Sequence, residues 1–526
     1  MSRRRRGFLW LVPLALGIVP LWVGWQLRGA LTYDDAYITL TYAKNIALGR
    51  GFVYNGGEPY LGTTTPLLAL LLGGLGALFP SVGVDAWALG VGTLAWIGGI
   101  WAAFALGRRI TGPWGGVFAA AVMATLPTFP HVLRAEFPLF IFLGLTGLLL
   151  TIDRRYWPAG AVFGLAFLAR GDAVILAGLA GLAALWRERR MPWGMVGGFL
   201  LILLPWSIYA MITFGSPLPA TLGVKRAHRA LGAWPHIAVG FWRWLTHSSP
   251  ALQVRFYASA LAAGVGLFVF WRERNAWGLV VVAWGLLYAL GYLLLNVPFY
   301  AWYATTLMVA MALGASLGMA RLGPDRFQTQ AFAPHTSTAS FGAIFSTAPR
   351  AGEPVRSAWM QTFSWGLIAV IVIAGAGAMA AKTHRLKTWR NPKIEAYLDA
   401  AAWLKANTPA DATVGFIEVG TIAYFSDRRI IDLLGLVTPG AEAYLAARDN
   451  AGLFKSLHPE YYIRNCHFDA WGMNRRVHES AFFQENYAPA AAFPQGDTDR
   501  PPVVIYRRLD VPGPPVEPAL DRDCRP

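Results

Sequence analysis

Long apolar runs divide this chain, and they limit what it can fold into. The first covers 7–27, and the others lie near 64–80, 86–107, 113–127, 138–152, 156–169, 173–186, 192–213, 256–271, 277–296, 300–320 and 363–381. About 20 apolar residues are needed to cross a bilayer as a helix, and shorter crossings are tolerated where neighbours bury their ends. Only 14% of the residues are charged, against about 25% in soluble domains. The sequence therefore predicts a mostly α, polytopic membrane protein.

Basic residues gather in the short gaps between these runs, and their placement predicts the orientation of the chain. Arginine clusters stand at 3–6, 108–109, 154–155, 187–190 and 272–274. Cytoplasmic loops carry an excess of Lys and Arg. All these clusters fall on the cytoplasmic side of the membrane if the 64–80 run does not cross it fully. That arrangement leaves about eleven membrane-spanning helices. The N-terminus is then cytoplasmic, whereas 28–62, 214–255 and the C-terminal region are extracytoplasmic. The net charge of +16 thus reflects membrane topology, and no nucleic-acid-binding motif accompanies it.

Two adjacent carboxylates, Asp34 and Asp35, stand just beyond the first apolar run. Like charges this close raise each other's pKa, and strongly perturbed acids often mark functional sites. A single Asp at this point could instead cap the following helix, but two exceed what a cap needs. Another acid, Glu136, is expected near the membrane surface, either paired with Arg134 or acting in a site.

The 214–255 segment is basic although it is expected on the extracytoplasmic side, whereas the other basic clusters are expected on the cytoplasmic side. Lys225, Arg226 and Arg229 occur in it, and cations there favour binding of an anion such as phosphate. The alternative is a solvated basic loop. Arg170 and Asp172 interrupt two apolar runs. A local ion pair in a tight turn explains them as well as a functional role does.

Beyond the apolar runs the composition changes. Residues 321–362 are rich in Gln, Thr, Ser, Ala and Pro, which predicts a flexible cytoplasmic linker. From 382 the chain reads as a small α/β domain, 382–526. Its expected helices are 394–407 and 421–426, and its expected strands are 413–419, 429–436, 461–464 and 503–506. Outside the cytoplasm, its Cys466 and Cys524 could form a disulfide.

Several stretches resemble the GT-C superfamily of integral-membrane glycosyltransferases. The resemblance is strongest to a bacterial branch that includes terminal arabinofuranosyltransferase-like enzymes, which use polyprenyl-phosphate sugars. The matching stretches are 34–45 (DDAYITLTYAKN), 49–55, 57–59, 62–66, 214–225, 420–427 and 431–436.

The resemblance implies a transmembrane glycosyltransferase domain, 1–381, with 382–526 outside the bacterial inner membrane. It further implies inverting transfer of a sugar from a polyprenyl-phosphate donor to an acceptor hydroxyl, for example on a cell-envelope glycan. A lipid-linked-sugar flippase and a protein O-mannosyltransferase-like enzyme are the alternatives. The flippase reading is weakened by the lack of an inverted repeat in the sequence.

The same resemblance assigns roles to residues. Asp34 or Asp35 would be the base, with Asp34 preferred, and Lys225 would contact the phosphate. Apart from the resemblance, the nearby cations Arg226 and Arg229 are further candidates to stabilise the charge on the leaving phosphate. Glu136 would be a second acid, although the Gly and Thr of the family's Gly-x-Glu-Thr pattern are missing here. The first loop would contribute further substrate contacts, namely Tyr37, Lys44, Glu58 and Thr64. A divalent metal on Asp34 and Asp35 is a further option, although so few carboxylates make a poor cage.

Overall fold

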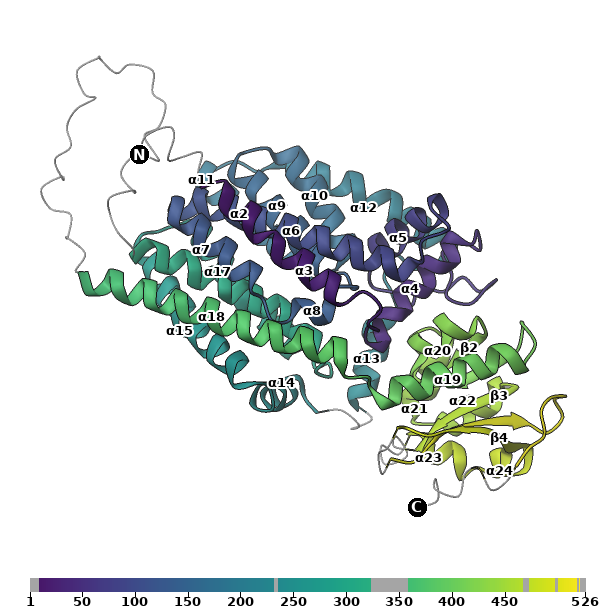
Figure 1. Cartoon of the computed structure of the whole chain (residues 1–526). Coiled ribbons are helices and arrows are strands. Elements are labelled where there is room, and N and C mark those ends of the chain that lie inside the picture. The colour runs from purple at the N-terminus through teal and green to yellow at the C-terminus, as the bar shows by residue number, and fades with distance from the viewer. Residues whose placement is uncertain are drawn as a thin grey trace, which may run out of the picture.

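A computed structural model describes residues 9–230, 235–322, 358–466, 473–496, 500–517 and 520. It consists of a helical body and a smaller C-terminal α/β domain that lies against one end of it (Figure 1). The helices of the body are α2 (Leu11–Leu16), α3 (Ile18–Gln26), α4 (Asp34–Ala47), α5 (Pro66–Leu78), α6 (Val84–Thr111), α7 (Pro113–Ala124), α8 (Phe129–Val132), α9 (Phe137–Ile152), α10 (Tyr156–Ala169), α11 (Ala173–Glu188), α12 (Trp193–Phe214), α13 (Thr221–Ala230), α14 (Ile237–Thr246), α15 (Pro250–Arg272), α16 (Ala276–Leu295), the 3-10 helix η1 (Ala301–Tyr303), α17 (Ala304–Leu322) and α18 (Ala358–Thr388).

Each apolar run of the sequence forms a helix, as expected. Six helical segments are long and apolar enough to cross a membrane, namely Val84–Thr111, Trp193–Phe214, Pro250–Arg272, Ala276–Leu295, Ala301–Leu322 and Trp359–Asn407. Shorter apolar helices pack among them, and α5 has only 13 residues. At 1.5 Å per residue α5 is about 20 Å long, less than the roughly 30 Å of a hydrocarbon core. The chain has the helices of an integral membrane protein, while the count of eleven spans stays a prediction.

Small residues let the helices of the body approach closely. A Cβ on Gly318 of α17 would lie 2.3 Å from the Cα of Gly266 on α15. Close approach through small residues is how membrane helices gain packing contacts without a hydrophobic driving force.

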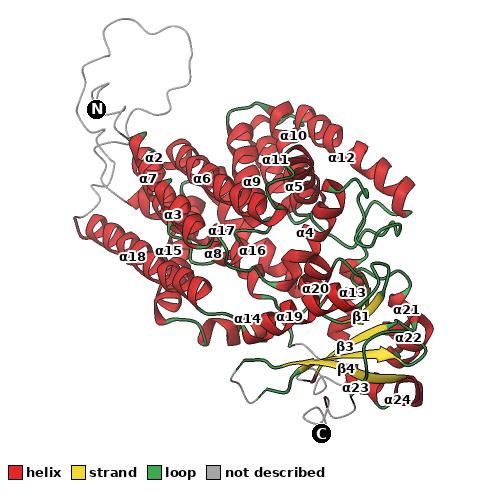
Figure 2. Cartoon of the chain, turned by 45° about the vertical axis from the view of Figure 1, so that its right-hand side comes forward, coloured by secondary structure: helices red, strands yellow, loops and turns green. Residues whose placement is uncertain are grey.

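The C-terminal domain is built on a mixed five-stranded sheet of order β2-β1-β3-β5-β4, and strands occur only in this part of the described chain (Figure 2). β1 pairs in parallel with β2 and β3, while β5 pairs antiparallel with β3 and β4. The strands are β1 (Thr413–Phe416), β2 (Arg429–Asp432), β3 (Tyr461–Asn465), β4 (Tyr487–Phe493) and β5 (Val503–Arg508). The helices are α19 (Pro392–Asn407), α20 (Val419–Ser426), α21 (Ala441–Ala447), α22 (Asn450–Leu457), α23 (Met473–His478) and α24 (Ala481–Asn486).

The expected helices and strands of this domain are present, and the fold class predicted from the sequence is confirmed. Several elements were missed: α21 to α24, which are short, and β4, whose Ala-rich sequence lacks strand formers. β4 carries Pro489 at a shift in register, and it lies at the sheet edge, where a proline is tolerated. α18 continues to Thr388, beyond the expected boundary at 382. Cys466 is disulfide-bonded, whereas Cys524 and most of the expected linker lie outside the described residues.

The first loop joins the body to the C-terminal domain. The Tyr54 hydroxyl donates to the Val419 carbonyl at 2.7 Å, and Asn55 exchanges two hydrogen bonds with the backbone of Ile430. Tyr42 and Phe52 share one buried cluster with the core of the C-terminal domain. The loop is therefore a packed interface rather than a free connection.

Candidate functional site

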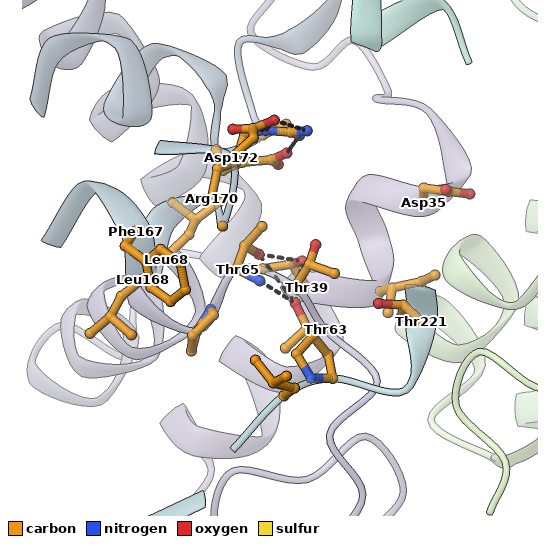
Figure 3. A pocket seen from close by; sticks show the side chains of 18 of the residues that line it. Asp35, Thr39, Thr63, Thr65, Leu68, Phe167, Leu168, Arg170, Asp172 and Thr221 are labelled. Atoms are coloured by element: carbon orange, nitrogen blue, oxygen red, sulfur yellow. Dashed lines mark hydrogen bonds and ion pairs between the residues drawn. The ribbon is translucent and has the colours of Figure 1, made fainter. Parts of the chain in front are cut away.

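A cavity of about 680 Å³ opens where the body meets the C-terminal domain (Figure 3). Its volume is inside the roughly 300–1,000 Å³ typical of small-molecule sites. The start of α4, the 61–66 segment and α13 form part of its wall, and Leu436 from the C-terminal domain completes it. Its polar and charged lining comprises Tyr33, Asp35, Thr39, Thr63, Thr64, Thr65, Arg134, Glu136, Arg170, Asp172, Ser207, Thr221, Lys225, Tyr292 and Tyr303.

The two adjacent aspartates have different surroundings. Successive side chains of a helix diverge by about 100°, and only Asp35 lines the cavity. The Asp34 carboxylate instead accepts two hydrogen bonds at the start of α20, from the N–H of Gly420 at 2.9 Å and from that of Thr421 at 2.7 Å. A carboxylate in that position satisfies free amides and complements the helix dipole. Asp34 is thus a cap, but for a helix of the other domain.

The Asp35 carboxylate is largely shielded from water. Burial raises the pKa of its carboxyl from 3.8 to about 6, with smaller upward contributions from Asp34 and Glu418 and an opposing one from Lys225. At neutral pH this carboxylate is ionised yet more basic than an ordinary aspartate. Such a group is suited to accept a proton.

Lys225 lines the same cavity as Asp35, and the two charges interact. It lies on α13 and donates a hydrogen bond to the Tyr303 hydroxyl at 3.3 Å. Its ammonium is 5.1 Å from the centre of the Tyr300 ring. Burial alone lowers the pKa of Lys225, but Tyr303 and Asp35 outweigh it, so the pKa is raised and the side chain is charged.

The other two predicted cations do not share this position. Arg226 is exposed, and its Nε donates to the Leu295 carbonyl at 3.4 Å outside the cavity lining. Arg229 lies on α13, but its side chain is outside the described residues.

Arg170 anchors a second polar group on the cavity wall. Its guanidinium donates to Glu136 at 2.7 Å, to Asp172 at 2.8 and 3.0 Å and to the Tyr292 hydroxyl at 2.8 Å. Of the two alternatives for Glu136, the pair with Arg134 is not found: Arg134 donates to the Leu27 carbonyl at 3.0 Å, and Glu136 pairs with Arg170. The local pair of Arg170 with Asp172 is confirmed. The sequence did not reveal that Arg170 also lines the cavity.

Of the predicted first-loop contacts, only Thr64 lines the cavity. Lys44 pairs with Asp427 and donates to the Tyr424 carbonyl at 2.7 Å. Glu58 pairs with Arg429. The Tyr37 ring packs at 5.1 Å from that of Tyr424. These three side chains hold the two domains together, and the cross-domain partners that they need lie far away in the sequence.

The acidic pair does not fit a divalent metal. Both Asp34 oxygens already accept backbone hydrogen bonds, and no group of three or more His, Cys, Asp or Glu side chains that could hold a metal occurs among the described residues. Calcium takes six to eight oxygen ligands, and magnesium needs nearly octahedral geometry.

Comparison with known proteins places the fold. Residues 369–506 match a family described as a domain of unknown function (DUF8728). No curated protein matches the chain.

Solved structures are similar over nearly the whole chain. The oligosaccharyltransferase of Archaeoglobus fulgidus in the apo form has a TM-score of 0.60 at 12% identity, covering 93% of this chain and 74% of that one. ArnT from Cupriavidus metallidurans has a TM-score of 0.55 at 14% identity in the apo state, covering 96% and 98%. ArnT bound to undecaprenyl phosphate has a TM-score of 0.53 at 13% identity, covering 98% and 100%. The fold is therefore like that of GT-C glycosyltransferases.

Proposed function

We propose that this protein is a glycosyltransferase that moves a sugar from a polyprenyl-phosphate donor to an acceptor hydroxyl. The observation that carries the proposal is that Asp35 and Lys225 line the same cavity of a GT-C-like fold. A basic carboxylate and a cation facing the same space are what transfer from a phosphate leaving group requires.

The donor class is supported by the cavity and by one similar structure. ArnT from Cupriavidus metallidurans was solved with undecaprenyl phosphate bound. Here the cavity combines the Lys225 ammonium with an apolar wall that includes Phe167, Leu203 and Trp206. The ammonium would bind the phosphate, and the apolar wall would contact the lipid.

In the proposed reaction the acceptor oxygen bonds to the anomeric carbon of the donor sugar. The bond between that carbon and the phosphate oxygen breaks, and its electron pair leaves with the phosphate. Asp35 takes the hydroxyl proton, a role typically worth about 10²–10⁴-fold in rate. Lys225 stabilises the charge that grows on the phosphate. One displacement inverts the anomeric configuration.

Arg170, Glu136 and Asp172 have a positioning role in this proposal. Both carboxylates are engaged by the guanidinium, which leaves Glu136 a weaker candidate for proton transfer than Asp35. The ion-paired cluster would keep the wall of the cavity rigid. We place the cavity mouth and the C-terminal domain on the extracytoplasmic side, because the arginine clusters at 108–109, 154–155 and 187–190 belong at the opposite face.

Transfer can be tested in detergent, where a flippase would have no compartment to move a lipid into. Purified protein would be mixed with labelled mannosyl, glucosyl or arabinofuranosyl polyprenyl phosphate and a membrane extract as acceptor. Label should leave the lipid with at least one donor, and Lys225→Ala should raise KM for that donor. Arg226→Ala removes a neighbouring exposed cation and is the matched control. If no donor is consumed, or if both variants behave alike, the proposal is wrong.

A further inference from the structure

Three threonine hydroxyls form a closed triangle in the cavity wall (Figure 3). The Oγ1 atom of Thr39 lies 3.0 Å from that of Thr63 and 3.0 Å from that of Thr65, and the last two are 3.1 Å apart. The three residues are only 9%, 3% and 3% exposed. They come from α4 and from the segment just before α5, so the fold brings them together. We call this group the threonine triangle.

The threonine triangle has more hydrogen-bond acceptors than donors. Each hydroxyl has one proton and two lone pairs. Three mutual bonds use all three protons but only three of the six lone pairs, and the Thr65 N–H takes one more at Thr63, at 3.3 Å. While all three mutual bonds are made, the triangle has free lone pairs but no free proton, so it favours an O–H or N–H group over a phosphate oxygen.

Thr39 of the threonine triangle lies one helical turn from Asp35. On α4, Asp35 and Thr39 are four residues apart, and both line the cavity. On α13, Thr221 and Lys225 repeat this spacing, and they also line it. Residues four apart share one helix face. Each helix thus presents a charged group and, one turn away, a hydroxyl to the same space.

We propose that the threonine triangle is the subsite that recognises the donor sugar, by accepting a hydrogen bond from one of its hydroxyl groups. The inference rests on the proposed function, because the anomeric carbon that the acceptor attacks must lie close to Asp35, the proposed base. One turn of α4, about 5.4 Å, separates Asp35 from Thr39, which is about the reach of one sugar ring. Acceptor hydroxyls have the same chemistry, so the experiment must separate the two sources.

The test compares binding of bare undecaprenyl phosphate with binding of undecaprenyl-phosphate mannose, or of whichever sugar-lipid the protein consumes. Thr63→Val keeps the side-chain shape but breaks the triangle. It should weaken binding of the sugar-lipid by about 3- to 10-fold, the usual range for one neutral hydrogen bond, and leave the bare lipid unaffected. Thr63→Ser should restore the affinity. Thr41→Val is the matched control, since that hydroxyl is also on α4 but donates to the Tyr37 carbonyl outside the cavity lining.

Each alternative outcome has a distinct meaning. Equal loss for both lipids, or no loss for either, would overturn the subsite. A change confined to KM for the acceptor would also overturn it, by assigning the triangle to the other substrate. If wild-type protein fails to bind bare undecaprenyl phosphate, or if Lys225→Ala leaves that binding unchanged, the proposed function itself fails. A Thr63→Val variant with an unchanged thermal transition excludes misfolding as the cause.

Discussion

Replacing the two adjacent aspartates one at a time should have opposite effects on activity and stability. Asp35→Asn removes the proposed base, so transfer should fall by about 10²–10⁴-fold. It also removes a buried charge. A rise in carboxyl pKa from 3.8 to about 6 corresponds to up to about 3 kcal/mol of destabilisation of the folded protein at neutral pH. Asp35→Asn should therefore be inactive and at least as stable as the wild type.

Asp34→Asn should show the reverse pattern. Both carboxylate oxygens of Asp34 accept N–H groups at the start of α20. An amide offers one oxygen and turns an NH2 group toward the other backbone donor, so at least one bond is lost. Leaving a buried donor unsatisfied costs about 1–3 kcal/mol. We expect lower stability with most of the transfer rate retained.

The pH dependence separates the two effects further. Because the folded pKa of Asp35 is raised, the charged form destabilises the native state, and this cost is absent below about pH 4 and complete above about pH 6. The gain in stability of Asp35→Asn should grow over that interval. Wild-type transfer should rise with pH through about pH 6 as the base ionises. Thermal unfolding in detergent and initial rates at several pH values measure both. Loss of transfer in Asp34→Asn, with native rates in Asp35→Asn, would refute the assignment.

Two further predictions concern the joint between the domains, and a third concerns the disulfide of the C-terminal domain. Gly420→Ala should strongly destabilise the protein in thermal unfolding, because its Cβ would lie 1.8 Å from the backbone oxygen of Asp34, whereas Gly74→Ala has nothing within 4 Å and should be neutral. Lys44→Met should cost about 1 kcal/mol, as a partly exposed ion pair does. Burial raises the pKa of Asp427, but the hydrogen bonds and charges of Lys405 and Lys44 outweigh it and lower the pKa below its ordinary value of 3.8. The difference between Lys44→Met and the wild type should therefore persist to pH values below the ordinary aspartate range and vanish only once Asp427 is protonated. Reduction of the disulfide at Cys466 should lower the unfolding temperature in a thiol titration.

The architecture was readable from the sequence because its signal is local. A run of apolar residues specifies a membrane-type helix whatever surrounds it, and the helix of 394–407 and the strands of the C-terminal domain follow from short patterns of the same kind. The edge strand β4 was missed because Ala and Pro carry no such pattern. Its place in the sheet is decided by pairing with β5, which tertiary contacts supply.

The site was only partly readable, because it depends on contacts between distant segments. The sequence singled out the Asp34–Asp35 pair and Lys225. Which of the two acids faces the cavity is decided by α20, whose amides bind Asp34 across 386 positions of the chain. The sequence favoured Asp34 because local patterns do not reveal a contact between residues so far apart in the chain. The threonine triangle likewise joins Thr39 to residues 24 and 26 positions away.

The C-terminal domain is therefore part of the site rather than an attached module. Through Asp34 it fixes the start of the helix that carries Asp35. Through the Leu434 carbonyl, 2.7 Å from the His228 ring, it also fixes α13, which carries Lys225. Leu436 then closes the cavity wall between them. Because the helices that carry Asp35 and Lys225 are both held by the same domain, the separation of these two side chains depends on how that domain is seated.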